Sequence, residues 1–190
     1  MNFLVKIAVE FSKFIAAFSI AAGVALAFVN VLARYVFESS LTWASELTIY
    51  LFLWSTFFGA VYCFKKDAHI NIDLLLTKVS AKSAKILMLI SYMVTLIYLL
   101  AIAYYGYEYV LLYIDLEEIS IDLEIPLWIP YSVVPISFAL SGLVILQKII
   151  TLLKTPAEKL QIKSEAKEIL DEFEVEQMLK QVEKKTGGML

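Results

Sequence analysis

Four long stretches of the chain are almost wholly apolar, and polar connections separate them. They cover residues 14–33, 47–64, 86–107 and 125–147, and none contains Asp, Glu, Lys or Arg. About 20 helical residues cross the roughly 30 Å hydrocarbon core of a bilayer. Lipid offers no partner to unpaired backbone groups, and the strands of a barrel would be shorter and would alternate in polarity. The pattern therefore predicts an all-α integral membrane protein with four transmembrane helices.

Composition agrees with this reading. Hydrophobic residues make up 61% of the 190, and the mean hydropathy is +0.77, whereas an ordinary soluble domain is roughly 45–50% apolar.

The first stretch is too long for the apolar region of a secretory signal, which spans only about 7–15 residues. We therefore expect it to be a retained anchor. The membrane domain is predicted to comprise residues 1–155.

The remaining segment, residues 156–190, has a different composition. Acidic residues and lysines alternate there with apolar residues at helical spacing, as in EAKEILDEFEVEQMLKQVEKK. This pattern is typical of an amphipathic helix on the cytoplasmic side. Such a helix could be simply solvated or could contact a cytoplasmic loop of a partner, and the sequence leaves both open.

Lysine positions predict the orientation of the four spans. Basic residues near the ends of spans tend to stay in the cytoplasm. Lysines precede the first span, lie between the second and third, and follow the fourth: Lys6 and Lys13; Lys65, Lys66, Lys78, Lys82 and Lys85; Lys148 and Lys154. The connection between the third and fourth spans, YIDLEEISIDLEIP, has five acidic residues and no basic one. Both termini are therefore predicted to be cytoplasmic.

The connection between the first two spans, RYVFESSLTWASEL, places charges beside bulky aromatic residues. Arg34 is expected at the end of the first helix and Glu46 in the first turn of the second, where Thr42 could provide the cap. The two charges could pair across a short hairpin. Tyr35 and Trp43 suit the headgroup level of the membrane. The stretch is thus either a hairpin tip alone or a tip where a partner docks.

The chain lacks the residues that several classes of membrane protein need for their function. Ionisable groups inside a membrane mark ion and substrate pathways, and these spans contain none. A thiol oxidase needs paired cysteines, whereas the chain has only Cys63, and a haem bundle needs histidines within the spans, whereas His69 lies beyond the second. We therefore expect a scaffold with no enzyme activity, no cofactor and no metal site.

The fourth span contains three prolines. Pro126 and Pro130 lie near its predicted outer end, where backbone donors are unpaired in any case, and Pro135 is expected to kink the helix.

Four motifs together resemble the small membrane subunit of tripartite ATP-independent periplasmic (TRAP) transporters. They are NVLARYVF at 30–37, SLTWASEL at 40–47, AHINIDLL at 68–75 and IPLWIPYSVVPISF at 125–138. The resemblance runs from the first span through the fourth, and the acidic tail lies outside it.

The resemblance implies a three-part secondary transporter of the bacterial inner membrane. In that family a periplasmic binding protein captures a small organic anion, often a carboxylate or an acidic sugar, and a large membrane subunit moves it inward with sodium ions. The small subunit is thought to brace the static part. The implied partners are that large multi-span subunit, the binding protein and membrane lipid, with no nucleic acid. Candidate residues for subunit contact or hairpin architecture are Arg34, Tyr35, Trp43, Glu46, His69, Asp73, Pro126 and Pro130.

Two other classes remain open at this point. An exporter of the small multidrug type would be a transporter by itself, but such proteins carry a glutamate within the first span, where this chain has only Gly23 and apolar neighbours. An unrelated four-helix membrane adaptor or assembly protein would have the same composition and would require fewer particular sequence features.

Overall fold

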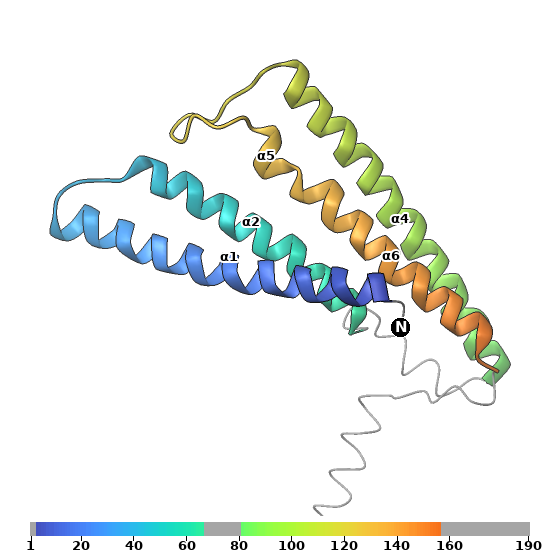
Figure 1. The fold of residues 1–190 in the computed structure, drawn as a ribbon. Helices are drawn as coiled ribbons and strands as arrows, with labels where there is room; N and C mark the ends of the chain where they lie inside the picture. The colour runs from blue at the N-terminus through green and yellow to red at the C-terminus, as the bar shows by residue number, and fades with distance from the viewer. Residues whose placement is uncertain (1–2, 67–80, 157–190) are drawn as a thin grey trace, which may run out of the picture. The chain divides into compact units, whose positions relative to one another are not determined.

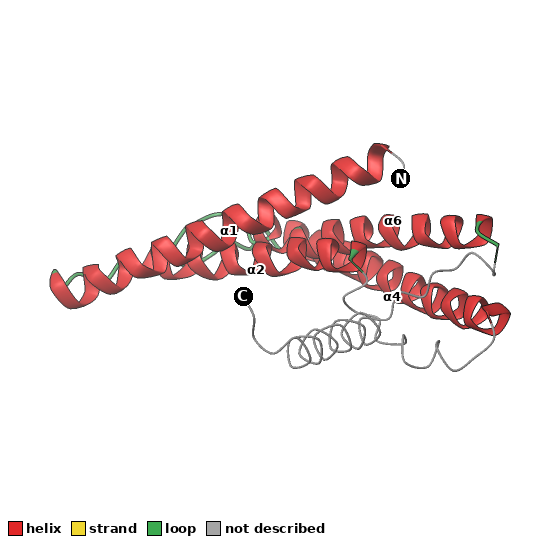
Figure 2. Ribbon diagram, turned by 90° about the horizontal axis from the view of Figure 1, so that it is seen from below, coloured by secondary structure: helices red, strands yellow, loops and turns green. Residues whose placement is uncertain are grey.

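The computed structural model describes residues 3–66 and 81–156. Their helices are α1 (Phe3–Val36), α2 (Thr42–Lys65), α4 (Ala81–Asp115), α5 (Trp128–Tyr131) and α6 (Val133–Lys154); Figures 1 and 2 show them from two directions. No strand occurs in the described parts of the chain, where Ile119 and Pro126 form one isolated β-bridge. Four helical segments are long and apolar enough to cross a membrane: Val5–Val36, Thr42–Lys65, Lys82–Asp115 and Trp128–Lys154. The predicted all-helical architecture with four candidate spans is confirmed.

The helices extend beyond the apolar stretches that predicted them. The first covers Phe3–Val36 and the third Ala81–Asp115, because backbone hydrogen bonding continues into the charged flanks. The fourth begins at Trp128, so its predicted start at residue 125 was wrong. Pro126 lies in the β-bridge with Ile119, and the N–H of Leu127 donates to the carbonyl of Glu118. These contacts hold the segment before α5 in a non-helical conformation.

Helices α1 and α2 form a closely packed antiparallel hairpin (Figure 1). Ser19 and Gly23 of α1 are buried, and the hydroxyl of Ser55 in α2 donates to the carbonyl of Ala16 at 2.9 Å. Small residues let the backbones of membrane helices approach closely, and hydroxyl groups hydrogen-bond across such interfaces. The small residues of α1 therefore determine how closely α2 packs.

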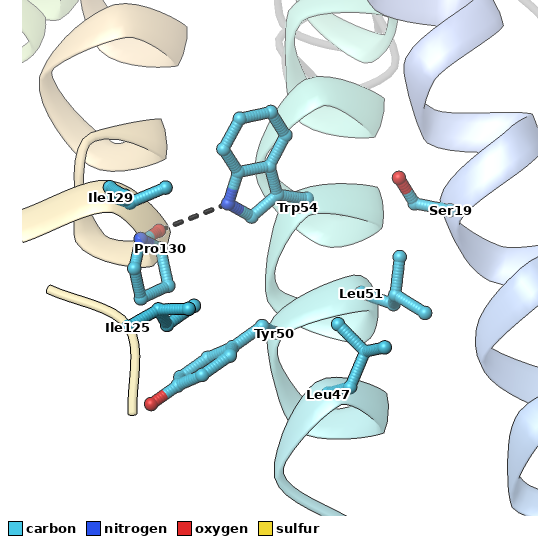
Figure 3. Close-up of a pocket in the computed structure, with 8 residues that line it drawn as sticks. All are labelled: Ser19, Leu47, Tyr50, Leu51, Trp54, Ile125, Ile129 and Pro130. Atoms are coloured by element: carbon cyan, nitrogen blue, oxygen red, sulfur yellow. Dashed lines mark hydrogen bonds between the residues drawn. The ribbon is translucent and has the colours of Figure 1, made fainter. Parts of the chain in front are cut away.

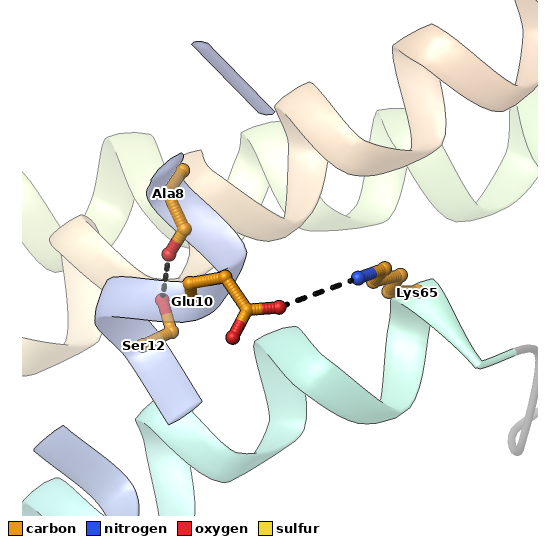
Figure 4. A network of polar contacts seen from close by, with 4 residues as sticks. All are labelled: Ala8, Glu10, Ser12 and Lys65. Atoms are coloured by element: carbon orange, nitrogen blue, oxygen red, sulfur yellow. Dashed lines mark hydrogen bonds and ion pairs between the residues drawn. The ribbon is translucent and has the colours of Figure 1, made fainter. Parts of the chain in front are cut away.

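The end of this hairpin that carries the N-terminus of α1 combines an apolar cluster with a partly exposed ion pair. Val5 and Val9 of α1 pack with Val61 of α2 and Val144 of α6. Beyond the cluster, Lys65 lies 3.8 Å from Glu10, and the hydroxyl of Ser12 donates to the carbonyl of Ala8 within α1 (Figure 4). The ion pair is solvent-accessible on both sides, so it contributes at most about 1 kcal/mol. The valine cluster is the main contact at this end.

Helix α6 packs against α4 and begins at a break in the helical hydrogen bonding. Ser132 separates α5 from α6. Pro135 has no N–H to offer the carbonyl of Tyr131, and a proline ring crowds the carbonyl four residues before it. We expected a kink at Pro135, whereas the structure has a break at Ser132, three residues before the proline.

Residues 81–88 and 154–156 belong to a second compact unit. Within it, the ammonium group of Lys85 donates to the carbonyl of Thr155 at 2.8 Å. The bond joins the beginning of α4 to the residue that follows α6.

The four glycines in the helices give a matched test of packing. A Cβ at Gly23 would lie 2.8 Å from the ring of Phe52, and one at Gly106 would lie 3.3 Å from both the backbone nitrogen and the ring of Pro135. At Gly59 and Gly142 the nearest atoms are 3.9 and 3.6 Å away. We expect Gly23→Ala and Gly106→Ala to lower the free energy of unfolding by about 1–3 kcal/mol relative to the two matched controls, Gly59→Ala and Gly142→Ala.

The measurement is unfolding in mixed micelles, followed by circular dichroism. The control substitutions should be neutral or stabilising by up to about 1 kcal/mol, since alanine favours the helix. Equal stability for all four variants would contradict the packing described at Gly23 and Gly106.

Candidate functional site

The carboxylate of Glu46 joins α2 to the connection between α4 and α5. Its Oε2 atom accepts hydrogen bonds from the backbone N–H groups of Asp122 and Leu123, both at 2.9 Å. Its Oε1 atom accepts the hydroxyl proton of Tyr50 at 2.7 Å. Hydrogen bonds to an ionised carboxylate are stronger than neutral ones. Glu46 therefore fixes a connection that lies 76 residues further along the chain.

The connection held by Glu46 has a defined internal structure. Ser120 is 2% exposed; its N–H donates to the carbonyl of Ile125 at 2.8 Å, and its hydroxyl accepts from the N–H of Ile125 at 3.2 Å. Glu117 and Glu124 have φ values of 49° and 53°, in the left-handed region that residues other than glycine seldom occupy. The connection is thus a tight turn, with its acidic side chains Asp115, Glu117, Glu118, Asp122 and Glu124 exposed.

The first connection is fixed by Asn30, which the sequence interpretation missed. Its Oδ1 atom accepts the N–H of Leu41 at 3.2 Å, and its Nδ2 group donates to the hydroxyl of Ser45 at 2.8 Å. Leu41 is the N-cap of α2 and has no side-chain cap, so the predicted cap by Thr42 was wrong. Asn30 is the only amide side chain in the first apolar stretch. That isolated polar residue was the signal that could have revealed it.

The predicted pairing of Arg34 with Glu46 was also wrong. Lys65 and Glu10 form the one ion pair found among residues 3–66 and 81–156. Glu46 was predicted to lie in the first turn of α2, but it lies one residue beyond that turn. Arg34 lies in the last turn of α1 and is exposed, as are Tyr35, at 77%, and Trp43 of α2, at 42%. Among the described residues, Glu46 has three hydrogen-bond donors, whereas Arg34 forms no ion pair.

The two candidate prolines make different contacts. Pro126 takes part in the β-bridge, and the carbonyl of the buried Pro130 accepts the indole N–H of Trp54 at 3.0 Å (Figure 3). A buried indole N–H normally finds a partner, yet nothing in the local sequence showed that Trp54 would find this one. The candidates His69 and Asp73 fall outside the described residues. Within the described ranges, no group of three or more His, Cys, Asp or Glu could hold a metal ion.

Comparison with known protein families decides which of the three classes applies. The sequence model of the DctQ component of tripartite ATP-independent periplasmic transporters matches residues 23–155, more than half of the chain. The chain belongs to this family. It is therefore a multi-pass membrane protein of the small permease type, and the resemblance inferred from the four motifs is confirmed. The DctQ match disfavours the multidrug exporter and the unrelated adaptor.

Three curated relatives are similar to this DctQ-family chain. The C4-dicarboxylate TRAP transporter small permease protein DctQ of Rhodobacter capsulatus is 33% identical over 101 residues, which are 53% of this chain and 44% of that protein. Its namesake from Vibrio cholerae is 34% identical over 79 residues, 42% of this chain and 34% of the relative. The ectoine TRAP transporter small permease protein TeaB of Halomonas elongata is 27% identical over 114 residues, 60% of this chain and 59% of TeaB. The chain thus spans between about a third and three fifths of these relatives' lengths.

Proposed function

We propose that the chain is the scaffold subunit of a TRAP-type secondary transporter in the bacterial inner membrane. It braces a large multi-span subunit that imports a small organic anion, such as a carboxylate or an acidic sugar, driven by a sodium gradient and supplied by a periplasmic binding protein. The observation that carries the proposal is the family match over residues 23–155. The names of the relatives, C4-dicarboxylate and ectoine permease proteins, support small polar substrates.

The hydrogen bonding within the spans supports a bracing role. Hydroxyl groups there bond to backbone carbonyls of their own or a neighbouring helix, as Thr48 does with Ala44 and Ser55 with Ala16. Transport sites within membranes instead rely on ionisable or unpaired polar groups. In this proposal the substrate and sodium sites belong to the large subunit.

The candidate residues receive two different roles in this proposal. Glu46, Pro126 and Pro130 serve the architecture of the outer connections, since their contacts lie within the chain. Arg34, Tyr35 and Trp43 contact the large subunit, since they are exposed at the first connection. His69 and Asp73 are assigned to the inner connection. Residues 1–155 form the membrane domain, and 156–190 form a cytoplasmic amphipathic tail.

Reconstitution in vesicles tests the proposal. The chain alone, the large subunit alone and the two together are supplied with binding protein, a sodium gradient and labelled organic acids. Uptake is expected only when both membrane subunits are present. Uptake by the chain alone would refute a scaffold role, and full uptake by the large subunit alone would show that no brace is needed.

The proposed orientation has its own test. Because lysines cluster on one side of the spans, we expect both termini in the cytoplasm. Alkaline phosphatase fused after Leu116 should be active, as in the periplasm, whereas the same enzyme fused after Leu76 should be inactive. Green fluorescent protein at the same sites serves as the reciprocal control. The opposite result would reverse every assignment of sides.

A further inference from the structure

A cavity of about 230 Å³ lies beside α2, at the level of Trp54. Figure 3 shows Leu47 and Leu51 of α2 on the side of α1. On the opposite side it shows Ile125, which precedes α5, and Ile129, which belongs to α5. An apolar cavity of about 150 Å³ is already large enough to hold benzene. The cavity can therefore accommodate several carbon atoms of a ligand.

Two of the three polar side chains in the walls, those of Trp54 and Tyr50, are hydrogen-bonded within the chain. The indole N–H of Trp54 donates to the carbonyl of Pro130, and the hydroxyl of Tyr50 donates to Glu46. No fully buried side-chain nitrogen or oxygen in the described residues lacks a partner. Ser19 adds a single hydroxyl group to the wall. A buried water needs two to four polar partners. The walls therefore favour hydrocarbon over water or a polar ligand.

The surroundings of the cavity indicate which kind of hydrocarbon ligand it would bind. The cavity residues of α1 and α2 lie within the candidate spans Val5–Val36 and Thr42–Lys65, and the cavity is not closed off from its surroundings. In a bilayer the medium around such helices consists of lipid chains. We propose that the cavity binds the end of one acyl chain of a membrane phospholipid. The acyl chain packs between the α1–α2 hairpin and the segment that leads into α5, and its binding does not depend on the transport role.

Trp54 provides a direct readout of this binding. The chain has three tryptophans, so that Trp43→Phe together with Trp128→Phe leaves the indole in the cavity wall as the only one. Phosphatidylethanolamine with dibrominated acyl chains is titrated into this protein in detergent, because bromine quenches indole fluorescence on contact. We expect saturable quenching, reversed by an excess of the unbrominated lipid.

Variants that fill the cavity separate this site from general contact with lipid. Leu47→Phe with Ile129→Phe adds two rings to the walls and should lower the saturable quenching at least twofold. Ile49→Phe with Ile136→Phe adds the same rings at exposed positions outside the cavity and should leave it unchanged. The single substitutions Leu47→Phe and Ile129→Phe should give intermediate values, and circular dichroism verifies the fold of each variant.

Three results would overturn the proposal. The first is quenching that rises linearly with lipid and never saturates. The second is equal quenching in the filled and control variants. The third is quenching by a dibrominated free fatty acid but not by the phospholipid. The large subunit is absent from all these measurements, so their outcome is separate from that of the uptake assay.

Discussion

Glu46→Ala is expected to release the connection between α4 and α5 and to lower the free energy of unfolding by about 3–5 kcal/mol. The substitution leaves the N–H groups of Asp122 and Leu123 without their acceptor and the hydroxyl of Tyr50 without its partner. Each hydrogen bond to a charged group is worth about 1.5–3 kcal/mol. Amide hydrogen exchange at residues 122 and 123 measures the release, and unfolding in mixed micelles measures the stability.

Two isosteric variants serve as controls for this substitution. Glu46→Gln retains a carbonyl oxygen that can accept from both N–H groups, so most of the stability should remain. Glu124→Gln removes one charge from the same connection at an exposed side chain, and it should change the stability by less than about 0.5 kcal/mol. Unchanged exchange at residues 122 and 123 in Glu46→Ala would show that the carboxylate does not hold this connection.

Arg34→Ala is expected to weaken the complex with the large subunit without destabilising the isolated chain. Arg34 is exposed and makes no ion pair with the described residues, so its removal costs the isolated chain little. At a dry subunit interface, truncating one member of a charge pair costs about 3–5 kcal/mol because the other charge is left unpaired. Co-purification with the large subunit and sodium-driven uptake should both fall, while unfolding of the isolated chain is unaltered.

Two control substitutions accompany Arg34→Ala. One places lysine at position 34, and the other places alanine at Lys6. Arg34→Lys keeps the charge but loses the planar group that binds a carboxylate in two places and stacks on aromatic rings such as Tyr35. It should rescue binding only in part. Lys6→Ala removes a positive charge near the other end of α1 and should leave co-purification unchanged. Normal co-purification and uptake for Arg34→Ala, at normal levels in the membrane, would limit Arg34 to the hairpin tip.

These two predictions give different roles to two charged residues of one stretch, residues 34–47, which the sequence analysis treated together. Arg34 and Glu46 lie in one short hairpin, and opposite charges at such spacing suggested a pair. The structure gives Glu46 two backbone donors from the connection between α4 and α5 and one hydroxyl donor from Tyr50 in its own helix, and it leaves Arg34 exposed. A loss of stability is therefore expected from the glutamate, and a loss of assembly from the arginine.

The sequence by itself determined the helices, because lipid forces an uncharged apolar stretch of about 20 residues to satisfy its own backbone hydrogen bonds. It also predicted an irregularity near Pro135, since the missing N–H of a proline is a local covalent property, whereas the structure has the break at Ser132. The errors lie at the helix ends, at Thr42 and at residue 125, where hydrogen bonds with other segments decide the conformation.

Only the tertiary structure decided which polar groups meet. The backbone partners of Glu46 and the partner of Trp54 lie 76 or 77 residues away, and hydrophobic periodicity has no information about such pairs. The two hydrogen bonds of Asn30 join residues that are 11 and 15 positions apart in the hairpin, and they depend on how the helices pack. Apolar patterning records each segment's preference for lipid, whereas hydrogen-bond geometry depends on angstrom-scale distances that exist only once the helices are assembled.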